Sequence, residues 1–261
     1  MRPITREPSA PIYYFCHGVP GSPADAELVV DGLPNGAKLL TPNLFEATKV
    51  GSELGKTVTA QFDEMVPDND APVYVIGFSI GAMVACHIAA NRPERVKRLS
   101  LISPAAPLQM GEFLPQMAGA PVFKMAEKLP LVFAGATMLQ GLILWMFPGF
   151  LIKSLFAKSG WQEKELLKEA SFRQAMKQSL DNSYRRYPWD YRRIVKAYVR
   201  DWSGVLEQIK CPVDLWHGTK DSWAPMEMSE ALIDAIPGEC ELHKIKDGEH
   251  YSTLAKYCVD G

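Results

Sequence analysis

The alternation of apolar, strand-like runs with helix-like segments over residues 11–103 constrains the fold of this chain most strongly. A strand, a loop and a helix repeat three times, and a further strand follows. Because parallel strands need a long crossover connection, usually a helix, this alternation predicts a mostly parallel sheet with helices on both faces. The strands are expected at residues 11–16, 37–42, 73–76 and 96–103, and the helices at 24–33, 52–66 and 79–91.

The alternation stops after residue 104 and resumes near residue 205. The residues between show helical periodicity and no clear strand. We therefore expect one α/β core in two parts, residues 1–104 and 205–261, interrupted by a helical cap at residues 105–204. In the second part, helices are expected at 203–209, 225–236 and 251–258, and strands at 211–218 and 239–246.

Composition narrows the class of protein. The chain has 261 residues, 47% of them hydrophobic, and a net charge of −2, which suits one large core and gives no sign of nucleic-acid binding. The N-terminal stretch MRPITREPSAP is polar, so no signal peptide is expected. Five scattered cysteines predict buried thiols in a reducing compartment, hence a cytoplasmic protein. No C-x-x-C or H-E-x-x-H occurs, and neither a metal nor a cofactor is expected.

The stretch VYVIGFSIGAMVA places a serine where an expected strand becomes an expected helix. Ser79 lies between Gly77 and Gly81 in a G-x-S-x-G pattern. A strand that turns directly into a helix forms a crowded corner, and flanking glycines let neighbouring backbone pass without a Cβ clash. A serine at that corner is exposed at the carboxyl end of the sheet beside free helix N–H groups, so Ser79 is a candidate nucleophile. A tight turn that merely contains a serine is the alternative.

A nucleophilic serine needs a general base and an acid that orients the base. Among the five histidines, His250 follows the last expected strand and therefore lies at the same sheet edge as Ser79. Asp221 also follows a strand and is the candidate acid. Asp247 and Glu249 are neighbours of His250 in sequence, but such close neighbours rarely face each other in the geometry required. The chain order is therefore Ser79, Asp221, His250.

Four motifs in this order, HGVPGS, GFSIGA, HGTKDSWAP and GEHYS, resemble the α/β-hydrolase superfamily, and specifically its members with an inserted helical cap. The resemblance covers residues 11–103 and 205–261. It implies that the backbone N–H groups of Val19 and Ile80 form the oxyanion hole. The usual two-strand N-terminal hairpin is expected to be missing or reduced, because only ten residues precede the first strand. This shortened edge leaves about six strands rather than eight.

The uncharged run at residues 129–152 is the most unusual part of the expected cap. We expect it to line an apolar substrate pocket above Ser79, with Leu142, Trp145 and Phe147 contacting the substrate. Contact with a membrane surface is the less favoured alternative, because proline and glycine interrupt a run barely long enough to span a bilayer. The basic and aromatic segment 183–200 is expected to be a cap face with its aromatic side chains turned inward, rather than a nucleic-acid site.

These observations predict a serine hydrolase that cleaves an ester, thioester, lactone or related acyl bond of a fairly apolar small molecule. Ser79 attacks, His250 moves the proton and Asp221 orients the imidazole. The same residues suit hydrolysis of a C–C, amide or peptide bond, and the fold also hosts ligand-binding proteins and lyases. The sequence leaves these alternatives and the oligomeric state open.

Overall fold

A six-stranded parallel sheet forms the centre of the molecule in the computed structural model, which describes residues 10–48 and 53–259. The strand order is β2-β1-β3-β4-β5-β6, and each neighbouring pair is parallel. This arrangement confirms the predicted α/β class and the estimate of six strands. The strands are β1 (Ile12–Cys16), β2 (Lys38–Leu40), β3 (Val73–Phe78), β4 (Val96–Ile102), β5 (Val213–Gly218) and β6 (Cys240–Ile245).

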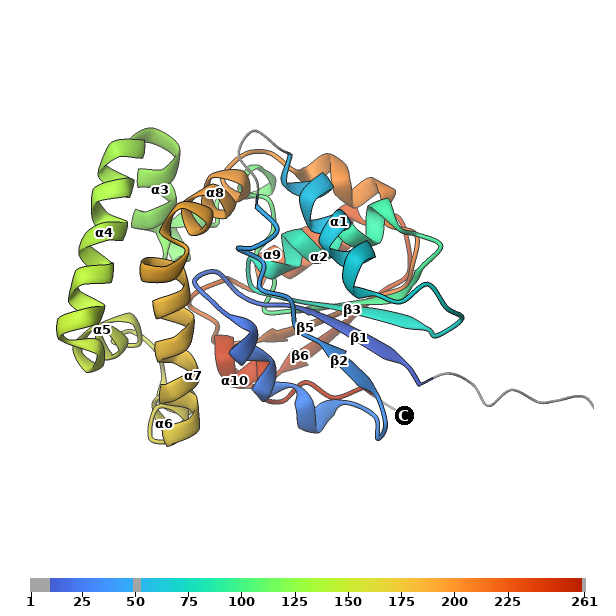
Figure 1. Ribbon diagram of the computed structural model, residues 1–261, viewed down its shortest axis with the longest axis horizontal. Coiled ribbons are helices and arrows are strands. Elements are labelled where there is room, and N and C mark those ends of the chain that lie inside the picture. Colours follow the sequence, from blue (N-terminus) through green and yellow to red (C-terminus); the bar gives the residue numbers. More distant parts are fainter. Residues whose placement is uncertain (1–9, 49–52, 260–261) are drawn as a thin grey trace, which may run out of the picture.

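Helices cover both faces of the sheet (Figure 1). On one face lie α1 (Leu54–Met65) and α2 (Gly81–Asn91); α10 (His250–Leu254) lies on the other. The helix α9 (Glu227–Ala235) connects β5 to β6. Burial on both faces explains why β1 is continuously apolar: all five of its residues are buried, from Ile12 to Cys16.

Two segments form tight helical turns where longer helices were expected. Residues 24–33 form two 3-10 helices, Pro23–Leu28 and Val30–Gly32. At Gly32 this segment lies against residues near the C-terminal end of the described chain: the Val259 N–H donates to the Gly32 carbonyl at 2.8 Å. The expected helix at 203–209 is likewise a 3-10 helix, Ser203–Gln208.

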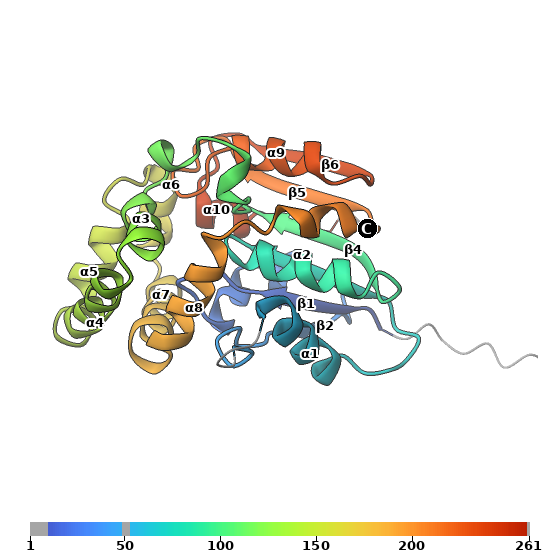
Figure 2. The same ribbon diagram turned by 90° about the horizontal axis from the view of Figure 1, so that it is seen from above.

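Between β4 and β5 the described chain is helical and adds no strand to the sheet. These helices pack beyond the carboxyl ends of the strands (Figures 1 and 2). They are α3 (Ala120–Lys128), α4 (Pro130–Met146), α5 (Pro148–Leu155), α6 (Trp161–Leu166), α7 (Ala170–Asp181) and α8 (Pro188–Tyr198), with a π-helical turn at Asn182–Arg186 and 3-10 helices at Leu108–Met110 and Leu114–Gln116.

Proline sets the start of three of these helices. Pro130, Pro148 and Pro188 are the first residues of α4, α5 and α8, where a missing N–H costs nothing. The amphipathic segment 163–180 is divided between α6 and α7. The Arg173 side chain donates to the carbonyls of Leu167 and Lys168, at 2.8 and 2.6 Å, which satisfies the backbone at the break. No described helix is long and apolar enough to cross a membrane.

Candidate active site

Ser79 occupies a strained corner between β3 and α2. Its φ is 54°, in the left-handed region that costs energy for a residue with a Cβ. Only glycine fits at position 81, because a Cβ there would lie 2.3 Å from the Cys16 carbonyl oxygen. A Cβ on Gly77 would lie 2.8 Å from the Cα of Ala82. The strand–turn–helix geometry expected from the sequence is therefore present at Ser79.

His250 and Asp221 meet in the buried interior beside this corner. His250 is the first residue of α10, and its Nδ1 lies 2.8 Å from Asp221 Oδ2. The other carboxylate oxygen of Asp221 accepts the N–H groups of Trp223 and Ala224, at 2.8 and 3.0 Å. Burial of this carboxyl works to raise its pKa, but the charge and hydrogen bond of His250 outweigh burial and lower the pKa of Asp221. Asp221 is therefore a buried carboxylate that is hydrogen-bonded to the His250 imidazole.

Aromatic side chains fix the plane of the His250 ring. Trp223 stacks on it, with ring centroids 5.6 Å apart and an interplanar angle of 12°. The Phe78 ring lies 4.8 Å away, and Phe78 immediately precedes Ser79 in the chain. Within the described residues no hydrogen bond engages Nε2 of His250, the ring nitrogen opposite the one bonded to Asp221.

A cavity of about 270 Å³ opens at Ser79, between the sheet edge and the helical insertion. Its walls are mostly apolar. The lining from the core includes Val19, Ile80 and Trp223, and the lining from the insertion includes Ala105, Met117, Val122, Phe123, Gln140, Leu155, Lys158, Tyr184, Tyr191 and Val195.

Val19 and Ile80, the expected oxyanion donors, both belong to the wall of this cavity. Both residues line the cavity with Ser79, and neither backbone N–H has a hydrogen-bond partner among the described residues. The loop that carries Val19 is anchored by His17, whose Nε2 accepts the Leu44 N–H at 3.0 Å and whose Nδ1 donates to the Gly18 carbonyl at 2.7 Å. Burial lowers the pKa of His17 to about 4, so the ring is a neutral, structural group.

The other acidic residues near His250 in sequence are engaged elsewhere. Glu249 accepts the N–H groups of Gly160 and Gln162, at 2.6 and 3.2 Å, and so ties α6 to α10. Asp247 pairs with Lys220 at 2.7 Å.

Sequence reasoning missed Glu163 entirely: it is fully buried, and its Oε1 accepts the Tyr251 N–H at 2.7 Å. A glutamate in an amphipathic helix is common, and nothing in the sequence around Glu163 indicates that it binds the distant Tyr251 N–H.

Three expected substrate contacts lie away from the cavity. Leu142, Trp145 and Phe147 are 48%, 66% and 59% exposed, and none of them lines the cavity at Ser79. The expectation fails because α4 is apolar on all sides, so its composition does not reveal which side faces inward. The helix contributes Gln140 to the cavity instead, a polar residue that sequence reasoning passed over.

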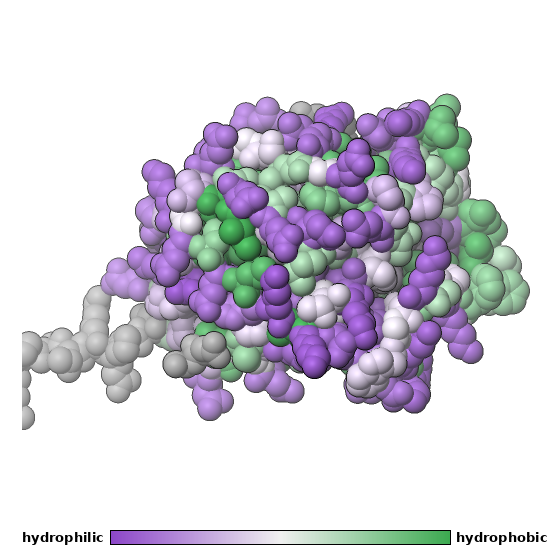
Figure 3. All heavy atoms as spheres, turned by 180° about the vertical axis from the view of Figure 1, so that it is seen from behind, coloured by the Kyte–Doolittle hydropathy of each residue, from purple (hydrophilic) through white to green (hydrophobic). Residues whose placement is uncertain are grey.

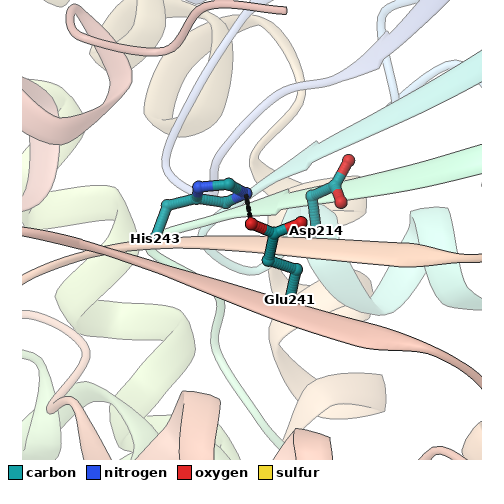
Figure 4. A group of neighbouring side chains, drawn as sticks. All are labelled: Asp214, Glu241 and His243. Atoms are coloured by element: carbon teal, nitrogen blue, oxygen red, sulfur yellow. Dashed lines mark ion pairs between the residues drawn. The ribbon is translucent and has the colours of Figure 1, made fainter. Parts of the chain in front are cut away.

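One group of side chains has the residue types of a metal site. Ligand atoms of Asp214, Glu241 and His243, on β5 and β6, all lie within 4.8 Å of one another (Figure 4). The Arg98 guanidinium already pairs with Asp214 at 2.6 Å, and the His243 ring stacks on Trp216. A cation would have to displace that guanidinium, so we assign no metal to this group.

Comparison with known proteins agrees with this geometry. A family model described as alpha/beta hydrolase fold matches residues 67–257. Two curated relatives are named pimeloyl-[acyl-carrier protein] methyl ester esterase. The one from Chromobacterium violaceum is 25% identical over 70% of this chain, and the match spans only 65% of its length. The one from Aromatoleum aromaticum is 25% identical over 85% of this chain and 84% of its own.

A solved structure shares the fold across nearly the whole chain. The enol-lactonase from Burkholderia xenovorans superposes with a TM-score of 0.64 at 17% identity, covering 95% of this chain and 86% of that one. At this identity the likeness concerns the fold alone. The family model covers well over half of the sequence, and the sheet, the serine corner and the resemblance noted in the sequence all agree with it. This chain belongs to the α/β-hydrolase family of enzymes.

Proposed function

We propose that this protein is a serine hydrolase of the carboxylic ester hydrolase type, with Ser79, His250 and Asp221 as its catalytic triad. The observation that carries the proposal is the buried Asp221–His250 hydrogen bond of 2.8 Å, held beside a serine in the left-handed conformation. The esterase names of the two curated relatives support the same reaction class.

The reaction follows from the placement of these groups. Ser79 Oγ attacks the acyl carbon while Nε2 of His250 takes its proton, and Asp221 stabilises the imidazolium that forms. The N–H groups of Val19 and Ile80 hold the oxyanion of the tetrahedral intermediate. The proton then passes to the leaving oxygen, whose bond to the acyl carbon breaks. Water hydrolyses the acyl-serine by the same steps with the same base.

The cavity favours a fairly apolar acyl group of modest size. Its volume of about 270 Å³ and its apolar walls suit an aliphatic or aromatic acyl chain of an ester, thioester or lactone. Two polar side chains from the insertion, Gln140 and Lys158, also reach the cavity. They offer a hydrogen bond and a positive charge to a polar group on the substrate. We propose that residues 105–204 serve as the cap that forms this side of the pocket.

A serine-directed probe tests the proposal. A fluorophosphonate should label the wild-type protein at Ser79, and the protein should hydrolyse short p-nitrophenyl esters. Ser79→Ala should lose both the label and the turnover, by several orders of magnitude. Ser171→Ala, which removes an exposed hydroxyl from α7, is the matched control and should retain both. Labelling that persists in Ser79→Ala would reject this assignment.

A further inference from the structure

The helix α4 is apolar on two opposite sides, and only one of them is covered. Its inner side buries Phe133, Thr137, Gly141 and Leu144 against the rest of the insertion. A globular surface helix normally turns a polar face outward, and a helix that is apolar all round is normally buried or in contact with lipid. The outer side of α4 therefore lacks a polar face and needs an apolar partner.

The outer side continues onto α5 and forms what we call the apolar face. Figure 1 places α4 and α5 at the end of the molecule farthest from the N-terminal side, and Figure 3 shows hydrophobic residues gathered at that edge. Nine large side chains that are 46–86% exposed make up this face: Leu131, Val132, Met138, Leu139, Leu142, Trp145, Met146, Phe147 and Phe150. A gathering of this kind marks an interaction site.

Lysines bound the apolar face at both ends of its sequence. The uncharged run 129–152 is bounded by Lys128 and Lys153, and Lys124 lies four residues before Lys128. These three lysines are exposed, and none pairs with a carboxylate of the described residues. Residues 105–204 as a whole contain 14 basic and 8 acidic residues, a net charge of +6, whereas the whole chain carries −2. The rest of the chain therefore carries −8.

We propose that the apolar face binds the surface of an anionic phospholipid bilayer, with α4 and α5 lying in the interface and the lysines contacting headgroups. Apolar side chains flanked by lysines, with tryptophan and phenylalanine among them, are the composition of helices that lie in a membrane interface. With 17 residues, α4 is too short to span a bilayer, in agreement with the absence of a spanning helix in the described chain. A second copy of this chain is disfavoured as the occupant, because pairing two such faces would bring together two strongly positive regions.

This surface is distinct from the proposed catalytic site but shares helices with it. Gln140 of α4 and Leu155 of α5 line the cavity at Ser79, so the same two helices separate the bilayer from the cavity. Binding to vesicles does not require the Ser79 reaction. The binding proposal and the proposed function are therefore tested by separate measurements.

Flotation with lipid vesicles tests the proposal. The wild-type protein should float with phosphatidylcholine vesicles that contain about 30 mol% phosphatidylglycerol, and less with phosphatidylcholine alone. Binding to the anionic vesicles should weaken in about 0.5 M NaCl. The triple variant Leu131→Asp, Met138→Asp, Phe150→Asp should lower the partition coefficient at least about tenfold. Val30→Asp is the matched control, because Val30 is an exposed hydrophobic residue of the α/β part of the chain, outside the insertion. It should bind like the wild type.

Fluorophosphonate labelling shows whether each variant retains its site. If the triple variant does not fold, Lys128→Glu with Lys153→Glu replaces it and should reduce binding to the anionic vesicles selectively. Wild-type protein that stays in the lipid-free fraction overturns the proposal, whether or not Ser79 reacts. So does equal flotation of the wild type and the variants. Light scattering that shows a dimer abolished by the triple substitution, without vesicle binding, assigns the face to a second copy.

Discussion

Asp25 provides a stability prediction that can be worked out from the structure. It lies in the 3-10 helix Pro23–Leu28 and is only 3% exposed. Its Oδ1 accepts the Ser179 hydroxyl of α7 at 2.6 Å, while its Oδ2 has no hydrogen-bond partner among the described residues. Burial is the largest influence and raises the pKa of Asp25 from its ordinary value of 3.8 to about 7, although the hydrogen bonds oppose it.

A raised carboxyl pKa means that the folded protein binds the proton more tightly than the unfolded chain. The resulting stabilisation is complete below the unfolded pKa and is lost as the pH rises through about 7. Each pH unit between the two pKa values corresponds to about 1.4 kcal/mol, so the loss amounts to about 4 kcal/mol at most. Asp25→Asn keeps an oxygen that can accept the Ser179 hydroxyl and does not titrate. It should therefore escape this loss.

Urea unfolding at several values from pH 5 to pH 8 measures the effect. The free energy of unfolding of Asp25→Asn minus that of the wild type should increase by about 1.4 kcal/mol per pH unit up to about pH 7 and level off above it. Asp31→Asn removes an equal charge from an exposed neighbouring position and controls for general charge effects. A difference that stays constant over this range, or that falls as the pH rises, refutes the reasoning.

Three further predictions test the site and the corner that supports it, and two of them include a control substitution. Asp221→Asn should lower kcat by about 10⁴, because its amide would hold the wrong tautomer of the imidazole. Gly81→Ala should lower the free energy of unfolding by roughly 3 kcal/mol or more because of the backbone clash, whereas Gly135→Ala, with open space around it, should raise it slightly. Phe123→Ala should shift the preferred acyl chain to longer esters, whereas Trp145→Ala should leave the chain-length profile unchanged.

Steady-state kinetics and urea unfolding decide these outcomes. An inactive Asp247→Asn beside a nearly normal Asp221→Asn would show that the wrong acid is assigned. Equal stability of the two glycine variants would contradict the steric argument for position 81. A chain-length profile that responds to Trp145→Ala but not to Phe123→Ala would mean that the outer face of α4, not the cavity, receives the acyl chain.

The sequence predicts the local architecture well where geometry is dictated by a few residues. The glycines around Ser79 identify the corner, because no other residue fits at position 81 beside the Cys16 carbonyl. The parallel topology brings the carboxyl ends of the strands to one edge, which is why residues as distant in sequence as Asp221 and His250 could be paired before their distance was known.

Contacts of the helical insertion are less predictable from sequence. A helix without charges, such as α4, has no polar stripe that tells its inner side from its outer side, so Trp145 was assigned to the wrong side. The links from Glu249 to α6 and from Glu163 to α10 join residues nearly ninety positions apart in sequence. They depend on how the insertion packs on the core, which no local pattern specifies.

The most direct test of the central claim is to trap the acyl-enzyme. The protein is mixed with a p-nitrophenyl ester, quenched with acid during turnover, digested and analysed by mass spectrometry. The account predicts the acyl mass on Ser79, together with loss of the adduct and of turnover in Ser79→Ala. An adduct on a different residue, or a Ser79→Ala variant that hydrolyses the ester at a rate within about threefold of the wild type, would contradict it.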